Sequence, residues 1–133
     1  MKLTHFTAIA IALSLSTHSA LANPAQVYCP PLDAVQCDGK GNCTLDAAYQ
    51  NDWGALQIHG QPQPTLFFGG IFMQGTTDCM YGSSFGNLVE IYSKRPLSPD
   101  TSNSKHWDHS IGVWICDKNG GIVEDCPMLL AQK

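Results

Sequence analysis

The sequence has few charged residues and little that indicates a catalytic motif. Only 14% of its 133 residues are charged, seven of them basic and eleven acidic. The basic residues are scattered without a stripe or run, which argues against a nucleic-acid partner or an anionic membrane surface. The one G-x-S-x-G match, Gly82-Ser83-Ser84-Phe85-Gly86, is interpreted as a serine-rich turn rather than as the turn that carries a nucleophile. We expect a binding protein rather than an enzyme, with no cofactor.

No two of the six cysteines form a C-x-x-C pair. This absence argues against a structural zinc site and against a redox-active dithiol. An even number of cysteines in an exported chain instead favours three disulfides. All six lie downstream of residue 22.

The N-terminal segment 1–22 has the features of a cleavable export signal. Lys2 supplies a positive charge, the stretch 6–15 is mostly apolar, and Ala20-Leu21-Ala22 has the small residues of a peptidase site. The apolar stretch is shorter than the about 20 residues that a membrane span needs. We predict cleavage after Ala22, which leaves 23–133 as a single secreted domain, extracellular or periplasmic, without a membrane anchor.

One disulfide follows from local sequence. Cys37 and Cys43 flank Asp38-Gly39-Lys40-Gly41-Asn42, whose glycines supply the positive φ of a short hairpin loop. Centring the turn on Lys40 places the two cysteines opposite each other, at a spacing close to that of a disulfide. We predict a Cys37–Cys43 bond.

The C-terminal cysteines are predicted not to pair with each other. Asn119-Gly120 is a strong hairpin signal between 112–116 and 122–126, and in that register Cys116 and Cys126 project from opposite faces. Two solutions then remain open. One joins Cys29 to Cys116 and Cys79 to Cys126, and the other joins Cys29 to Cys126 and Cys79 to Cys116.

The mature chain has the pattern of a β protein. Aromatic and branched residues are concentrated in 65–68, 70–73, 87–92 and 106–116, with shorter candidate strands at 34–37, 43–45, 55–59 and 79–81. Gly69-Gly70 marks a bend or bulge. A short helix over 45–53 and a long surface loop over 93–104 complete the prediction. The fold class is an all-β, disulfide-stapled, jelly-roll-like sandwich of about 7–9 short strands.

The densest group of potential metal ligands is His106-Trp107-Asp108-His109. In a strand, His106 and Asp108 share one face and His109 takes the other, so at most two of them face one ion. We therefore treat His106 and His109 as a candidate metal site and polar residues at a strand entrance as the alternative. His59 is a further candidate ligand.

Aromatic residues suggest a binding surface. Exposed rings stack on the apolar face of sugars, which makes Trp53, Trp107 and Trp114, with Asp108 for hydroxyl groups, candidate ligand-binding residues. In one regular strand Trp107 and Trp114 face opposite sides, so at most one would lie in the core. The alternative is that both tryptophans are packing residues.

The leading functional hypothesis is a secreted, effector-like or adhesin-like protein that binds a glycan or a protein outside the cell. A small hydrolase with a carboxylate or histidine site is one alternative. Its acids would come from the dispersed set Asp52, Asp78, Glu90, Asp108 and Glu124, in which no spacing singles out a pair. An inhibitor-like protein that presents the 93–104 loop is the other alternative.

The order of several short motifs resembles a known group of proteins. Tyr28-Cys29-Pro30-Pro31, Cys37, Gly41-Asn42-Cys43, an isolated Trp53 and a late Trp107 before Cys116 are similar to an uncharacterised family of small secreted domains in Gram-negative gammaproteobacteria. The resemblance implies a bacterial exported protein, and some members of that group are type II secretion substrates. It assigns no activity and no site residues. Small cysteine-rich secreted proteins of fungi are the alternative source.

Overall fold

The chain is an all-β protein in the computed structural model, which describes residues 25–40, 42–55, 63–83 and 88–131, with backbone only for 118–120. Eleven strands and two single-turn 3-10 helices, η1 and η2, account for the regular structure of the described residues. The predicted all-β, sandwich-like class is confirmed. The strands outnumber the predicted seven to nine because several contain only two or three residues. No helix in the described ranges is long and apolar enough to cross a membrane.

The largest sheet has six antiparallel strands in the order β4-β7-β6-β5-β10-β9. Their bounds are Trp53–Ala55 (β4), Leu66–Met73 (β5), Thr76–Gly82 (β6), Leu88–Ser93 (β7), Trp107–Ser110 (β9) and Val113–Gly121 (β10). The predicted segments 65–68 and 70–73 are one strand, β5. The expected irregularity is present, since the register with β6 shifts between Phe67 and Gly69. The predicted strand 55–59 begins within β4, and its remainder lies outside the described residues.

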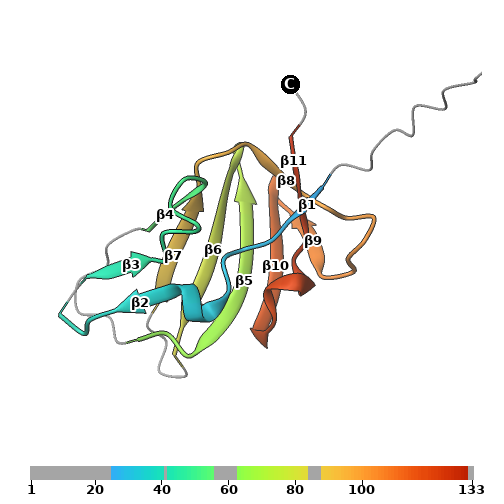
Figure 1. Ribbon diagram of the computed structural model, residues 1–133. Helices are drawn as coiled ribbons and strands as arrows, with labels where there is room; N and C mark the ends of the chain where they lie inside the picture. The colour runs from blue at the N-terminus through green and yellow to red at the C-terminus, as the bar shows by residue number, and fades with distance from the viewer. Residues whose placement is uncertain (1–24, 41, 56–62, 84–87, 132–133) are drawn as a thin grey trace, which may run out of the picture.

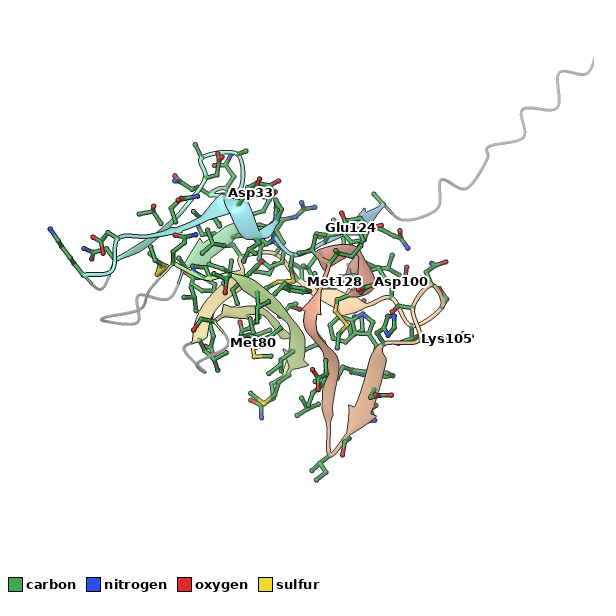
Figure 2. All side chains as sticks on the ribbon, turned by 90° about the horizontal axis from the view of Figure 1, so that it is seen from below. Asp33, Met80, Asp100, Lys105, Glu124 and Met128 are labelled. Atoms are coloured by element: carbon green, nitrogen blue, oxygen red, sulfur yellow. A yellow bond between two sulfur atoms is a disulfide. The ribbon has the colours of Figure 1, made fainter. Side chains whose placement is uncertain are left out.

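Two smaller sheets form a second layer (Figure 1). A three-stranded sheet has the order β1-β11-β8, and β2 pairs with β3. These elements are Gln26–Val27 (β1), Leu32–Ala34 (η1), Val35–Cys37 (β2), Cys43–Leu45 (β3), Leu97–Pro99 (β8), Val123–Asp125 (η2) and Met128–Leu130 (β11). Figure 2 shows Asp33, in this layer, and Met80, in β6, on opposite sides of the molecule.

The core lies between the two layers. Cα partners on neighbouring antiparallel strands share a face, which places Trp107, Cys116, Gly70, Cys79 and Ile91 in one row on the inner face of the six-stranded sheet. Four of these side chains are buried, and a Cβ on Gly70 would lie 3.0 Å from the Trp107 ring. The glycine in the middle of β5 thus makes room for the indole.

Three disulfides hold this arrangement, and they join Cys29 to Cys79, Cys37 to Cys43 and Cys116 to Cys126. The predicted Cys37–Cys43 bond is confirmed across β2 and β3. Both predicted solutions for the other four cysteines are wrong, and so is the hairpin at Asn119-Gly120. β10 continues to Gly121, which pairs with Phe67 of β5, and η2 then returns Cys126 to Cys116. The bonds are consistent with an oxidising compartment.

The segment 106–116 is a hairpin rather than one strand. Ile111 and Gly112 both have positive φ, at 51° and 75°, and form the two-residue turn between β9 and β10. Trp114 therefore pairs with His109, and Cys116 pairs with Trp107. The expectation that the two tryptophans face opposite sides is wrong, because reversing the chain at Ile111 brings both to the inner face.

Two further expectations about the connections are wrong. The segment 45–53 is not a helix, because 47–52 forms consecutive turns between β3 and β4, with the Asp46 carboxylate accepting the Ala48 N–H at 3.1 Å. The segment 93–104 is not one surface loop, because it contains β8, in which Leu97 is buried. The Asp100 side chain is also buried and accepts hydrogen bonds from Gln26 and Asn103. The bond from Gln26 and the pairing of β8 with β11 attach the segment to the second layer, and Lys94, Pro96 and 101–103 remain exposed.

Candidate functional site

Three adjoining hollows share one residue, Glu124. The first has a volume of about 300 Å³ and is bounded by 31–32, the start of β5 and 121–124. The second, also of about 300 Å³, adds Tyr28 and Tyr49. The third, of about 210 Å³, is formed with residues 103–106. We call the three hollows together the Glu124 groove.

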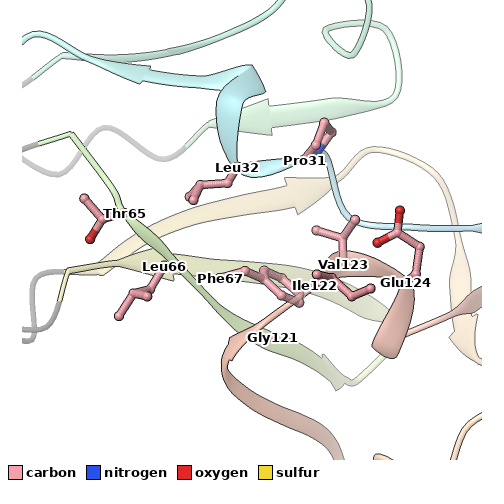
Figure 3. A pocket seen from close by; sticks show the side chains of 9 residues that line it. All are labelled: Pro31, Leu32, Thr65, Leu66, Phe67, Gly121, Ile122, Val123 and Glu124. Carbon is pink, nitrogen blue, oxygen red and sulfur yellow. The ribbon is translucent and has the colours of Figure 1, made fainter.

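The first hollow is mainly apolar (Figure 3). Its lining side chains come from three segments that are distant in sequence and include Leu32, Leu66, Phe67, Ile122 and Val123. Phe67 and Val123 are buried, Leu32 and Leu66 are half-buried, and Ile122 is 63% exposed. An apolar group entering here would cover Ile122 and contact side chains that the fold already holds in place.

Local sequence and one disulfide position the walls of the groove. Pro31 precedes η1 with an extended backbone, and the Ala34 N–H donates to the Pro31 carbonyl at 2.9 Å. On the other wall, the Asp125 carboxylate accepts the Ile122 N–H at 3.3 Å, and the Cys126 N–H donates to the Val123 carbonyl at 3.2 Å. The Cys116–Cys126 bond attaches this turn to β10. The groove therefore lies between two short turns with hydrogen-bonded backbones.

The third hollow is polar. Lys105, His106, Glu124 and Asp125 contribute to its lining. Ser104 shapes this end, because its hydroxyl donates to the Asp125 carbonyl at 2.8 Å and accepts the His106 N–H at 3.1 Å. The groove thus runs from an apolar end at Leu66 to a polar end with two carboxylates, an ammonium and an imidazole.

Asp100 fixes the segment that carries this polar end. Its carboxylate accepts hydrogen bonds of 2.7–2.8 Å from the side chains of Gln26, Ser102 and Asn103. Burial works to raise the pKa of Asp100, but the bonds from Gln26, Asn103 and Ser102 outweigh it and hold the pKa below its ordinary value. The ionised carboxylate therefore organises the chain just before Ser104.

The predicted tryptophan platform is mostly in the core. Trp53 is 4% exposed and Trp107 is 6% exposed, and the Trp107 indole N–H donates to the Pro127 carbonyl at 2.8 Å. Trp114 is half-buried, with its ring centroid 4.7 Å from that of His109. Asp108 projects from the opposite face of β9. The structure therefore does not bring the four predicted ligand-binding residues together.

The candidate metal ligands are also separated. His106 precedes β9 and lines the third hollow, whereas His109 lies in β9 against Trp114. Within the described ranges, no group of three or more His, Cys, Asp or Glu side chains is placed to hold a metal ion. His59 lies outside the described residues.

Sequence reasoning missed most of the Glu124 groove. Glu124 was considered only as one of several dispersed acids, and Leu32, Leu66 and Ile122 carried no signal of a site. The one relevant signal was Pro30-Pro31, which indicates an extended segment followed by a turn. Comparisons of the chain with protein-family models, curated proteins and solved structures found no match.

Proposed function

We propose that this protein is an exported, non-enzymatic binding protein that engages a protein partner through the Glu124 groove. The observation that carries the proposal is that an apolar hollow and a polar one are both lined by a single carboxylate residue, Glu124. Protein interfaces commonly have this composition, with an apolar anchor in a pocket and polar contacts at the rim. The predicted signal at 1–22 and the resemblance to gammaproteobacterial secreted domains support a partner outside the cell.

A protein partner is favoured over a glycan by the burial of the aromatic residues. Sugar recognition by stacking needs exposed rings, and Trp53 and Trp107 are buried. Trp114 with His109 is the remaining aromatic pair on which a sugar ring could stack. The first hollow instead has the volume and the aliphatic lining that suit a leucine, phenylalanine or tyrosine side chain.

The experiment maps binding of side-chain analogues by amide chemical shifts of the oxidised protein. Isobutanol and p-cresol are the probes, and methyl glycosides are the comparison. We expect the two probes to shift the amides of Leu32, Ile122 and Val123. Replacement Ile122→Asp should abolish these shifts, and Leu130→Asp is the control because Leu130 is also exposed but lies in β11. Shifts centred on Trp114, produced by the glycosides, would support a glycan ligand instead.

A hydrolase is the second candidate, and one observation favours it. The third hollow brings His106, Glu124 and Asp125 to one lining, as a histidine–carboxylate site requires. The Ser104 hydroxyl donates to the Asp125 carbonyl and accepts the His106 N–H. We therefore assign Ser104 a role in holding the loop rather than in catalysis. Hydrolysis of a peptide or glycoside library by the wild type, lost in both Glu124→Gln and His106→Ala, would favour this candidate over the binding protein.

A further inference from the structure

The outer face of the six-stranded sheet, opposite the second layer, has a continuous apolar patch. Register places Ile115, Ile71 and Tyr92 in one row, in which Asp78 lies between the last two. The next row contains Val113 beside Met73. We define the outer-face patch as Ile71, Met73, Met80, Tyr92, Val113 and Ile115.

The patch side chains remain accessible. Met73 is 46% exposed, Ile115 is 38% exposed and Tyr92 is 37% exposed, and the other three are half-buried. Figure 2 shows Met80 on the side of the sheet away from the second layer. The two smaller sheets contribute to the core on the inner face, and no described element covers the outer face. Grouped apolar side chains on an exposed sheet face are typical of an interaction surface.

The charges within this face have one sign. Asp78 is in the central row, Asp108 is opposite Ile115, Glu90 is opposite Met80, and Asp117 is opposite Gly69. Among outward-facing strand residues whose side chains are described, none is Lys, Arg or His. Burial raises the pKa of Asp78, as expected for a carboxylate among apolar side chains. The like charge disfavours a second copy of this face and disfavours an anionic membrane.

The neighbouring hairpin tip adds an independent observation. Ile111 is 98% exposed and has a φ of 51°, a left-handed conformation that is unfavourable for a β-branched residue. It lies between Ser110 and Val113, at the end of the sheet that bears the patch, where Val113 pairs with Met73. An exposed apolar side chain in a strained turn does not stabilise the free protein, and it would be covered if a partner extended past Val113.

We propose that the outer-face patch, with Ile111 at its end, is a docking surface for a cationic amphipathic polypeptide. Apolar side chains of the partner cover Ile71, Val113 and Ile115, and its Lys or Arg residues pair with Asp78, Asp108 and Glu90. This surface shares no residue with the Glu124 groove, which lies beside the start of β5 and η2, so a single molecule of this protein can bind two partners.

The test uses a synthetic peptide of alternating lysine and leucine as the probe. Binding to the isotope-labelled, oxidised protein is followed by amide chemical shifts and by titration calorimetry at increasing salt. We expect shifts in β5, β6 and β10 and an affinity that falls with salt. Asp78→Asn/Asp108→Asn should weaken binding about tenfold, the sum of two rim charge pairs. Ile115→Lys should weaken it at least as much, because it removes an apolar contact and adds a like charge.

The matched control is Asp33→Asn/Asp46→Asn, which removes the same charge from the second layer, where both residues are exposed. This control should retain wild-type affinity, and an alternating glutamate–leucine peptide should not bind. Equal weakening in the two double variants would overturn the proposal, because binding would then depend on net charge alone. The proposal would also be overturned if the peptide did not bind or if its shifts were confined to the Glu124 groove. A dimer in sedimentation that Ile115→Lys dissociates would overturn it as well.

Discussion

The bond between Cys116 and Cys126 joins the inner row of β10 to the residue that follows η2, across a sequence separation of 10. The intervening segment includes Ile122, Val123 and Glu124, which form one wall of the groove. The disulfide thus stabilises the fold and shapes the candidate site at the same place. Since Cys116 pairs with Trp107 in the sheet, the wall is also connected to the core.

Replacing both Cys116 and Cys126 by Ser should lower the free energy of unfolding by about 2.5–3 kcal/mol, the chain-entropy value for a loop of this length. Urea unfolding monitored by tryptophan fluorescence measures the change. The amides of Ile122–Glu124 should also shift in the double variant. The matched control, Cys37→Ser/Cys43→Ser, should lower stability and leave these amides unchanged. Unchanged Ile122–Glu124 amides after loss of Cys116–Cys126 would show that the bond does not position the wall.

The Asp100 cluster makes stability depend on pH. The folded-state pKa lies below the unfolded value, so the carboxylate stabilises the fold above the unfolded pKa, and this contribution is lost as pH falls through the folded pKa. Asp100→Asn should lower the free energy of unfolding at neutral pH by about 1.5–3 kcal/mol, the range for charged hydrogen bonds. The difference from wild type should shrink towards acid pH. A pH-independent difference would contradict an ionised Asp100.

Tyr81 provides a test of the link between the second layer and the large sheet. Its hydroxyl donates to the Pro30 carbonyl at 2.5 Å, and burial, with a smaller effect from Tyr49, raises the pKa of the phenol. Tyr81→Phe leaves that carbonyl without its donor and should cost about 1–3 kcal/mol of unfolding free energy. Tyr28→Phe is the control, because its hydroxyl binds Gln26 in an exposed pair. A stability loss no larger than in the control would contradict a buried bond between the layers.

Ile111 should be replaceable with a gain in stability. Asn adopts positive φ more readily than Ile, and Asn-Gly is a preferred two-residue hairpin turn. Ile111→Asn should therefore raise the free energy of unfolding by about 1 kcal/mol, measured by urea denaturation. Gly112→Ala is the opposite control. It should be destabilising because Gly112 has a φ of 75°, a backbone conformation that is strained for alanine even though no atom obstructs the added methyl group. A destabilising Ile111→Asn would show that the isoleucine contributes to the free fold.

Local sequence was sufficient where a feature depends on neighbouring residues. The Cys37–Cys43 bond follows from a short glycine-containing loop, and the bulge in β5 follows from Gly69-Gly70. The same reasoning failed at Asn119-Gly120, because the pairing of Gly121 with Phe67 is non-local and extends β10 through the expected turn. The real turn at Ile111-Gly112 was missed because isoleucine rarely adopts positive φ.

The candidate site was harder to predict than the fold. Leu32, Leu66 and Ile122 meet only because η1, β5 and the end of β10 are adjacent in space. The burial of Trp53 and Trp107 follows from packing between layers, which the aromatic composition alone does not indicate. The predicted histidine pair is separated because His106 precedes β9 and lines the third hollow, whereas His109 lies in β9 against Trp114.

The most direct test of the proposed function is selection of a random displayed peptide library on the oxidised wild-type protein. Counter-selection on Ile122→Asp removes peptides that bind elsewhere, including those on the outer face. The account predicts peptides with an apolar or aromatic anchor beside Lys or Arg, which bind the wild type and Leu130→Asp equally and Ile122→Asp at least about tenfold more weakly. Selected peptides that bind wild type and Ile122→Asp with equal affinity would contradict a partner site in the Glu124 groove.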